Sequence, residues 1–313
     1  QRLRKIKNWV TRTSRRIETN RWVRAGDGVA HRLPHFVVYE PTLLCNIHCN
    51  FCYVADILNP DDWRAKELTL EDLDRIFVSG GVKRFNITGG EPFVRKNLFS
   101  IFDLLRKKGM RCDYITTNGT VITDEKAQKL AELARSGFLK HISVSIDGPE
   151  AFHDEIRGQR GAFDKATRNI ARLRRTFDAL GLTAPVSINT TLTAGNLHLL
   201  PQIVDAASEM EVELIGLNQL MFATRREVQE TLQLIGETDP GIISTHVTDD
   251  PGLDPEEVPE LLKKAMDYGE SKGVTINWRP AQSLEHLKKY YTPGEPLRGR
   301  CWVHIIWATS RLW

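Results

Sequence analysis

The chain has 313 residues, of which 41% are hydrophobic and 27% are charged, and its formal net charge is +3 at pH 7. This length suits one large domain with an appendage, or two domains, and the small net charge argues against a nucleic-acid-binding protein driven by bulk charge. No apolar run reaches the roughly 18 residues of a membrane-spanning helix, and the charged start lacks the apolar part of a secretory signal. We therefore expect no transmembrane segment and a cytoplasmic protein.

Residues 1–34 form a basic extension at the N-terminal end. Ten arginines and lysines in this stretch face two acids, Glu18 and Asp27, and the apolar residues Leu3, Ile6 and Trp9 recur at helical spacing. Two interpretations remain open. The extension is a solvated helix packed on the main domain, or residues 1–33 contact an anionic surface such as lipid headgroups, an acidic carrier or an acidic substrate.

From residue 35 to residue 222 the pattern alternates between strands and helices. The predicted strands are 35–44, 83–88, 111–117, 141–146, 186–192 and 212–220. The predicted helices are 70–78, 98–108, 124–136, 163–180 and 197–210. Gly109, Gly137 and Gly181 follow three of these helices, where glycine provides the left-handed cap. The alternation predicts an α/β fold with parallel strands, a partial (β/α)6 TIM-like barrel whose ligands gather at the carboxyl ends of the strands.

Beyond residue 222 the alternation weakens. Helices are expected at 225–235 and 255–272, a proline-rich surface loop at 238–255, and short strands at 274–278 and 302–307. We therefore divide the chain into the basic extension 1–34, the core 35–222 and a C-terminal extension 223–313, a cap of helices and short strands.

Cys45, Cys49 and Cys52 lie within eight residues directly after the first strand. Three close thiols do not resemble a disulfide framework, and thiolates favour iron–sulfur clusters or zinc. A structural zinc site needs a fourth ligand, and His48 would serve only if the loop turned inward. Three thiolates on a four-iron cluster leave one iron open to a small molecule. The spacing favours the cluster, and a zinc-stabilised binding module without catalysis is the alternative from another class.

The spacing Cys-x3-Cys-x2-Cys, with Phe51 before the last cysteine, resembles the radical S-adenosylmethionine superfamily. Further motifs of that family follow at the ends of successive predicted strands. They are Thr88-Gly89-Gly90-Glu91-Pro92, Thr116-Thr117-Asn118-Gly119, Ser143-Val144-Ser145-Ile146-Asp147-Gly148, Ile156-Arg157-Gly158, and the asparagines between Asn189 and Asn196. The resemblance covers roughly residues 36–220. It is closest to the branch with C-terminal SPASM or twitch auxiliary-cluster domains, which includes molybdopterin-biosynthesis enzymes, sulfatase maturases and peptide-modifying enzymes.

This resemblance implies a mechanism. Cys45, Cys49 and Cys52 would ligate a [4Fe-4S] cluster whose open iron is chelated by the amino and carboxylate groups of S-adenosyl-L-methionine. An electron from a flavodoxin- or ferredoxin-type donor then breaks the sulfur–carbon bond. The resulting 5′-deoxyadenosyl radical abstracts hydrogen from the substrate.

The resemblance also implies a binding site for the methionine end of S-adenosylmethionine. Gly89, Gly90 and Glu91, after Thr88, would meet the amino group, because glycine lets a backbone approach a ligand closely. Glu91 would oppose the ammonium charge, and its other interpretation is an acid in a first helical turn that faces the helix dipole. Arg157 would approach the methionine carboxylate or the ribose, or else be structural.

The remaining residues carried over from the family would contact the nucleoside end. Thr117 and Ser145 are polar strand-end residues, and Ser145 is assigned to the ribose. The backbone at Phe51, beside Tyr53, would run along the adenine. Asn189 would contact the carboxylate or ribose, or be structural.

Alternation along the strands predicts what lines the barrel. If Thr117 points inward, then Ile115 and Asp113 do so too, and Cys112 points outward as a structural thiol. An inward Ser145 brings Ser143 and His141 with it, and an inward Asn189 brings Ser187 and Thr191.

Cys301 stands where related enzymes begin their auxiliary-cluster domain. It is a single cysteine, so an auxiliary cluster is expected only if the polypeptide continues beyond Trp313, which we favour over a remnant cap. The expected substrate is a small molecule: a sugar, nucleoside, lipid or amino acid. The alternative enzyme class is a radical S-adenosylmethionine peptide or protein maturase.

Overall fold

The computed structural model describes residues 36–64, 67–77, 82–236, 238, 246–279, 283–292 and 307–309, and all structural statements concern these residues. The predicted helix in the basic extension, Cys301, and most of the predicted strand at 302–307 lie outside them. No helix in the described part of the chain combines the length and apolar character that crossing a membrane requires.

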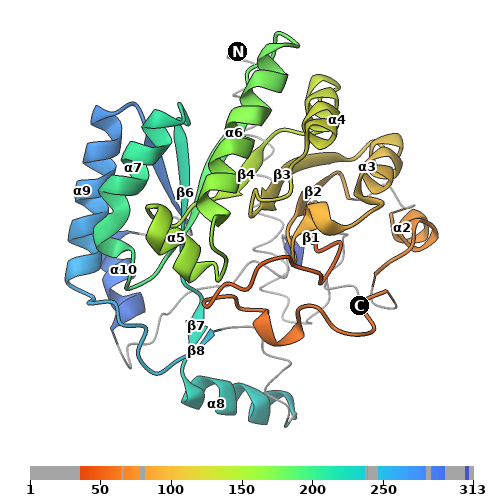
Figure 1. Ribbon diagram of the computed structural model, residues 1–313. Helices are drawn as coiled ribbons and strands as arrows, with labels where there is room; N and C mark the ends of the chain where they lie inside the picture. The colour runs from red at the N-terminus through yellow and green to blue at the C-terminus, as the bar shows by residue number, and fades with distance from the viewer. Residues whose placement is uncertain are drawn as a thin grey trace, which may run out of the picture.

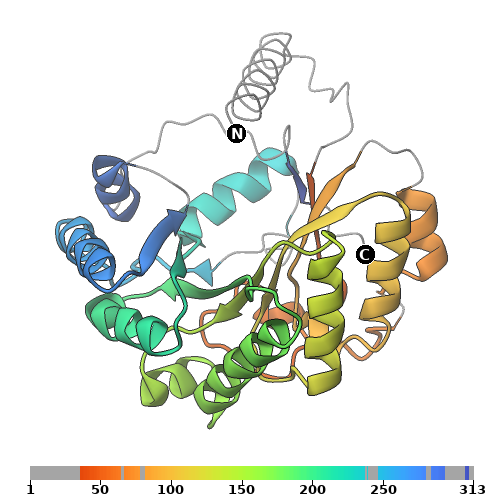
Figure 2. The same ribbon diagram turned by 90° about the horizontal axis from the view of Figure 1, so that it is seen from above.

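Eight of the described strands form the main parallel sheet, in the order β10-β1-β2-β3-β4-β5-β6-β9. Their bounds are β1 Phe36–Tyr39, β2 Arg84–Ile87, β3 Arg111–Thr117, β4 Ile142–Ser145, β5 Val186–Leu192, β6 Leu214–Gln219, β9 Thr275–Arg279 and β10 Trp307–Thr309. Seen from above, the sheet bends into an open arc (Figure 2), which is the expected partial barrel. The six predicted strands are confirmed, and β9 and β10 extend the sheet at its two edges.

Helices cover the convex face of the sheet (Figures 1 and 2). The described helices are α2 Leu70–Ile76, α3 Leu98–Lys107, α4 Asp124–Arg135, α5 Glu150–Ile156, α6 Ala162–Asp178, α7 Leu200–Glu209, α8 Arg225–Ile235, α9 Glu257–Ser271 and α10 Leu284–Tyr291, of which α8 does not lie on this face. Hydroxyl side chains cap the N-termini of several of them: Thr69, Thr123, Thr224 and Ser283. Gly109, Gly137 and Gly181 have φ values of 71°, 74° and 67°, so the predicted left-handed caps are confirmed.

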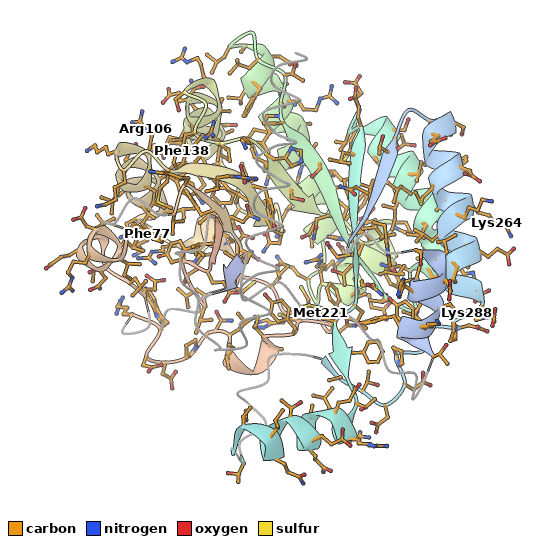
Figure 3. All side chains as sticks on the ribbon, turned by 180° about the vertical axis from the view of Figure 1, so that it is seen from behind. Phe77, Arg106, Phe138, Met221, Lys264 and Lys288 are labelled. Carbon is orange, nitrogen blue, oxygen red and sulfur yellow. The ribbon has the colours of Figure 1, made fainter. Side chains whose placement is uncertain are left out.

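The apolar core fills the space between the sheet and these helices. It contains Phe85 of β2, Val144 of β4 and Leu217 of β6, all fully buried. Figure 3 shows Phe138 close to the sheet, while Arg106, Lys264 and Lys288 lie at the outer surface of the helices. The convex face therefore supplies the packing, and the concave face and the strand ends are left for polar groups.

Strand register decides which residues face the concave side. Ser143 pairs with Ser187 and Ser145 with Asn189, and they alternate with Ile142 and other residues of the outer core. The predicted inward pairs are therefore confirmed for these strands.

The assumption that Thr117 points into the barrel is wrong. Thr117 pairs with Val144, so it shares the helix side with Ile115, while Thr116 pairs with inward Ser143. Cys112 is also fully buried in the outer core, as a structural thiol would be. It reaches the same side as Ile115 because the pairing of β2 with β3 shifts between Phe85 and Asn86.

Several boundaries differ from the sequence prediction. The first strand ends at Tyr39 because Pro41 has no amide hydrogen for a strand ladder and the chain then turns toward the cysteines. The short helices α5 and α10 were not predicted, nor was the parallel pair β7 Phe222–Ala223 and β8 His246–Val247. Helix α8 lies beyond the carboxyl ends of the strands (Figure 1).

The C-terminal part of the chain contributes to the main sheet. Leu217 of β6 pairs with Trp278 of β9, and Phe36 of β1 pairs with Trp307 of β10. The division at residue 222 stays a prediction, and β9 and β10 continue the core sheet across it.

Candidate functional site

The three cysteines lie on the loop that follows β1, which we call the cysteine loop, residues 45–52. It runs along the carboxyl ends of the strands, at the lower side of Figure 1. Each thiol is half-buried. The pKa of Cys45 is raised to about 11, mainly by burial; a hydrogen bond from the Ile47 backbone opposes this rise, and the nearby Glu91 and the other two cysteines add to it. All three cysteines belong to one eight-residue segment, which turns back on itself where the Cys52 amide donates to the Cys49 carbonyl at 3.2 Å.

The donor set of this loop fits an iron–sulfur cluster. Within the described ranges, no three His, Cys, Asp or Glu side chains are grouped tightly enough to hold a single metal ion. His48 is exposed, so it does not turn inward to complete a closed zinc site. Cysteine thiolates are the usual protein ligands of iron–sulfur clusters. Cys45, Cys49 and Cys52 would hold it.

The turn formed by Gly89 and Gly90 lies directly on the segment that leads into the cysteine loop. The amide of Gly90 donates to the Thr42 carbonyl at 3.0 Å, and the amide of Glu91 donates to the Leu44 carbonyl at 2.8 Å. A methyl group on Gly90 would fall closer than 3.0 Å to the Leu44 carbonyl oxygen. The glycines are therefore required by the chain's own backbone, a reason that the sequence analysis, which considered only a ligand, did not identify.

Glu91 is 1% exposed and its carboxylate has three protein donors. It accepts from the Thr117 hydroxyl at 2.8 Å, the Asn118 amide at 2.8 Å and the Phe93 amide at 3.1 Å. Burial raises the pKa of Glu91, and the hydrogen bonds from Asn118 and Thr117 oppose that rise. The carboxylate thus ties together two strand-end turns and caps the short helix at Pro92–Val94.

The turn at residues 117–120 holds one side of the cysteine loop through neutral groups. The Asn118 side chain donates to the Asn46 side-chain oxygen at 3.0 Å. Asn46 donates in turn to the Thr120 hydroxyl at 2.8 Å. Asn46 lies between Cys45 and Cys49, so these bonds fix the first part of the loop.

The other side of the loop is held by the end of α5. The amide of Asn50 donates to the Ile156 carbonyl at 3.0 Å. Gly158 has a φ of 63°, and a methyl group there would fall closer than 3.0 Å to the His48 carbonyl oxygen. A side chain at residue 158 would therefore push the cysteine loop away.

Arg157 reaches beneath the loop and is 7% exposed. Its Nε and Nη2 atoms each lie 2.6 Å from the carboxylate of Asp147, which is fully buried. Its Nη1 atom lies 3.6 Å from Cys49 Sγ, and its guanidinium carbon lies 5.1 Å from the centre of the Phe51 ring. Burial raises the pKa of Cys49, and the charge of Arg157 opposes this rise.

The remaining predicted site residues occupy two places. Ser145 and Asn189 are neighbours on the concave face, where the Asn218 side chain donates to the Asn189 side-chain oxygen at 2.7 Å. Thr88 and Tyr53 form hydrogen bonds to residues at the end of β1. The Thr88 amide donates to the Tyr39 carbonyl at 3.2 Å. The Tyr53 hydroxyl donates to Glu40 at 3.3 Å.

Sequence reasoning missed residues that shape the loop without touching its thiols. Asn46, Asn118 and Asp147 were visible inside the motifs, but the sequence analysis assigned no contact to any of them. No sequence motif pointed to Arg95. It is buried and donates hydrogen bonds to the carbonyls of Pro41 and Leu68. These bonds stabilise the segment before the cysteines.

A parallel partial barrel with three cysteines on one strand-end loop defines a class of protein, an α/β protein of the kind that binds its ligands at the carboxyl ends of the strands. Residues 39–193 match the profile of the Radical SAM superfamily. Residues 39–193 are therefore a Radical SAM domain, and through it the chain belongs to this superfamily. A SPASM-type branch is not established by these matches.

Curated relatives cover more of the chain. Fe-coproporphyrin III synthase of Methanosarcina barkeri is 33% identical over 204 residues, which are 63% of this chain and 47% of that protein. Pre-heme d1 synthase of Dinoroseobacter shibae is 28% identical over 277 residues, 81% of this chain and 61% of that protein. The chain thus spans about half to three-fifths of the length of these two relatives.

Solved structures confirm the fold. The Streptococcus suis enzyme SuiB, crystallised with its precursor peptide SuiA, superimposes with a TM-score of 0.58 at 17% sequence identity. The match covers 82% of this chain and 51% of SuiB.

Proposed function

We propose that the cysteine loop binds a [4Fe-4S] cluster and S-adenosylmethionine, and that the enzyme starts radical chemistry on a small molecule. The observation that carries this proposal is the triplet of half-buried thiols, Cys45, Cys49 and Cys52, on one eight-residue loop at the carboxyl ends of the strands. When bound, the cluster supplies the electron that cleaves S-adenosylmethionine to a 5′-deoxyadenosyl radical, which abstracts hydrogen from the substrate.

The chain's own groups would orient the cosubstrate. The 88–91 turn presents backbone beside the cysteine loop, which suits the ammonium group of the methionine end. The Glu91 carboxylate already accepts three hydrogen bonds, so we assign it mainly to holding this turn. Ser145 and Asn189 would contact the ribose and carboxylate from the concave face, and Phe51 with Tyr53 would border the adenine.

A small-molecule substrate is the preferred class. The concave face carries small neutral polar groups, including the hydroxyls of Ser143 and Ser187, 3.2 Å apart, and the linked amides of Asn189 and Asn218. These groups suit hydrogen bonds to a polar organic molecule. Because both curated relatives described above are named as synthases of heme-related compounds, an iron porphyrin or porphyrin precursor is the first compound class to test.

A peptide or protein maturase is the second candidate. The precursor peptide bound to SuiB favours it, although that likeness concerns the fold alone. The zinc-stabilised binding module is disfavoured, because His48 is exposed and does not complete a fourth position.

Further assignments belong to the same proposal. The electron would come from a flavodoxin- or ferredoxin-type donor in the cytoplasm. An auxiliary iron–sulfur cluster would exist only if the polypeptide continues beyond Trp313. Residues 1–33 would bind an anionic surface. We also propose that 1–34, 35–222 and 223–313 act as extension, radical core and cap.

The test is anaerobic reconstitution with iron and sulfide, followed by incubation with S-adenosylmethionine, dithionite and iron coproporphyrin III. We expect about four irons per chain, by the cluster's stoichiometry, together with 5′-deoxyadenosine and a mass change in the porphyrin. Replacing Cys45, Cys49 and Cys52 by alanine should abolish iron binding and 5′-deoxyadenosine. The control Cys112→Ala removes a buried thiol away from the loop and should retain both. Iron or 5′-deoxyadenosine in the triple variant would contradict the assignment.

A further inference from the structure

A buried ion pair lies beneath the cysteine loop. Asp147 follows β4 and is fully buried, and its carboxylate accepts from Arg157 at 2.6 Å and from the Thr191 amide at 2.9 Å. These bonds fix the guanidinium plane and leave its Nη1 atom directed at Cys49 Sγ, 3.6 Å away. The Phe51 ring lies against the same guanidinium at 5.1 Å. Arg157 therefore has one fixed orientation.

This geometry has a redox consequence when the Cys49 sulfur is a thiolate bound to iron. Hydrogen bonds to ligand sulfurs and nearby charges set the reduction potentials of iron–sulfur clusters. A cation beside the thiolate stabilises the reduced cluster, which carries one more negative charge. Arg157 lies between Asp147 and the sulfur, so its positive charge acts at shorter range than the negative charge of Asp147.

We propose that Arg157, oriented by Asp147, is a positioning residue that donates a hydrogen bond to the Cys49 thiolate and thereby raises the reduction potential of the cluster. This inference rests on the proposed function, since it requires a cluster on the cysteine loop. It is separate from any contact that Arg157 makes with S-adenosylmethionine. The two members of the pair have opposite effects on the potential.

The experiment is a redox titration of the reconstituted full chain, followed by electron paramagnetic resonance, without S-adenosylmethionine. Arg157→Gln should make reduction at least tenfold less favourable, a negative shift of about 59 mV for one electron. Asp147→Asn keeps an oxygen acceptor for the Thr191 amide but leaves the cation uncompensated, so it should shift the potential in the positive direction.

The control is Arg172→Gln. Arg172 donates to the Ile122 carbonyl at 3.0 Å and pairs with Asp124. It makes no described bond to the cysteine loop, so its loss should leave the potential unchanged. The omission of S-adenosylmethionine ensures that a lost ligand contact cannot produce the shift.

Four outcomes would overturn the inference. An unshifted potential in iron-loaded Arg157→Gln does so, and so do shifts of the same sign in Arg157→Gln and Asp147→Asn. If Arg157→Gln fails to retain iron, Arg157→Lys keeps the charge but not the planar fork, and a wild-type potential in that variant has the same meaning. A wild-type protein without a cluster signal overturns the proposed function together with this inference.

Discussion

At the carboxyl ends of the strands, backbone segments lie directly against one another, whereas at the amino ends charged side chains and glycine-capped helix termini face solvent. The Gly90 and Gly158 positions leave no room for a methyl group, but Gly109, Gly137 and Gly181 at the opposite end have open space around them. The amino end is held instead by Asp113, which pairs with Arg84 and Lys140. Close backbone packing thus stabilises the carboxyl ends of the strands, whereas ion pairs near the surface stabilise the amino ends.

Two matched glycine variants test this difference between the two ends, and they have the largest expected effect. Gly158 and Gly181 have φ values of 63° and 67°, so alanine meets a similar backbone penalty of about 1 kcal/mol at both positions. Gly158→Ala also forces the His48 carbonyl to move, which adds about 1–3 kcal/mol of overpacking strain. We expect Gly158→Ala to lose most of its iron and Gly181→Ala to keep it, as measured by urea unfolding and iron analysis. Equal losses in the two variants would remove the distinction between the ends.

The second prediction concerns the pH dependence of the site end. Burial lowers the pKa of His153 to about 4, and the nearby charge of Asp147 opposes this shift. The unfolded chain takes up a proton near pH 6.5 and the folded chain only near 4, so stability falls as the pH drops below 6.5 and is unaffected above it. Between pH 6.5 and 5 this His contributes a loss of about 2 kcal/mol.

His153→Asn keeps an acceptor for the Asp147 amide, which donates to His153 Nδ1 at 3.1 Å. Its unfolding free energy should change less over the same pH window, as followed by urea titration of the reduced, cluster-free protein. A wild-type slope in this variant would assign the pH dependence to other groups.

The smallest effect is expected at the amino end. Asp113→Asn removes a charge that is itself 10% exposed, but its partners Arg84 and Lys140 are 48% and 47% exposed, so solvent screens both pairs. Exposed ion pairs contribute little, so the unfolding free energy should fall by about 1 kcal/mol or less. The loss should shrink in 1 M salt, where the Debye length is about 3 Å. A loss above that of Gly158→Ala would reverse the comparison.

The fold was largely predictable because its signals are local. Periodicity located the six core strands, and glycine located the helix ends at residues 109, 137 and 181. The edge strand β9 lies within one residue of the strand predicted at 274–278. The short helices α5 and α10 were not predicted, because few residues carry each pattern.

The candidate site was predictable as a set of motifs but not as a set of contacts. The order of the motifs placed the cysteine loop, the 88–91 turn and the 117–120 turn at one edge of the sheet. The bond between Asn46 and Asn118 spans 72 residues, and the contact between Cys49 and Arg157 spans 108. Contacts over such separations depend on tertiary packing, and local propensity does not reveal them.

The distance along the chain between the cysteines and the groups that hold them has a consequence for biogenesis. A nascent chain that has just released Cys52 from the ribosome has all three thiols, yet Arg157 and Gly158 have still to be synthesised. The loop takes its final shape only after β4 and α5 have formed. We therefore expect the cluster to be inserted only after most of the barrel has assembled. Until then the three cysteines would be reduced thiols on a loop without its final conformation.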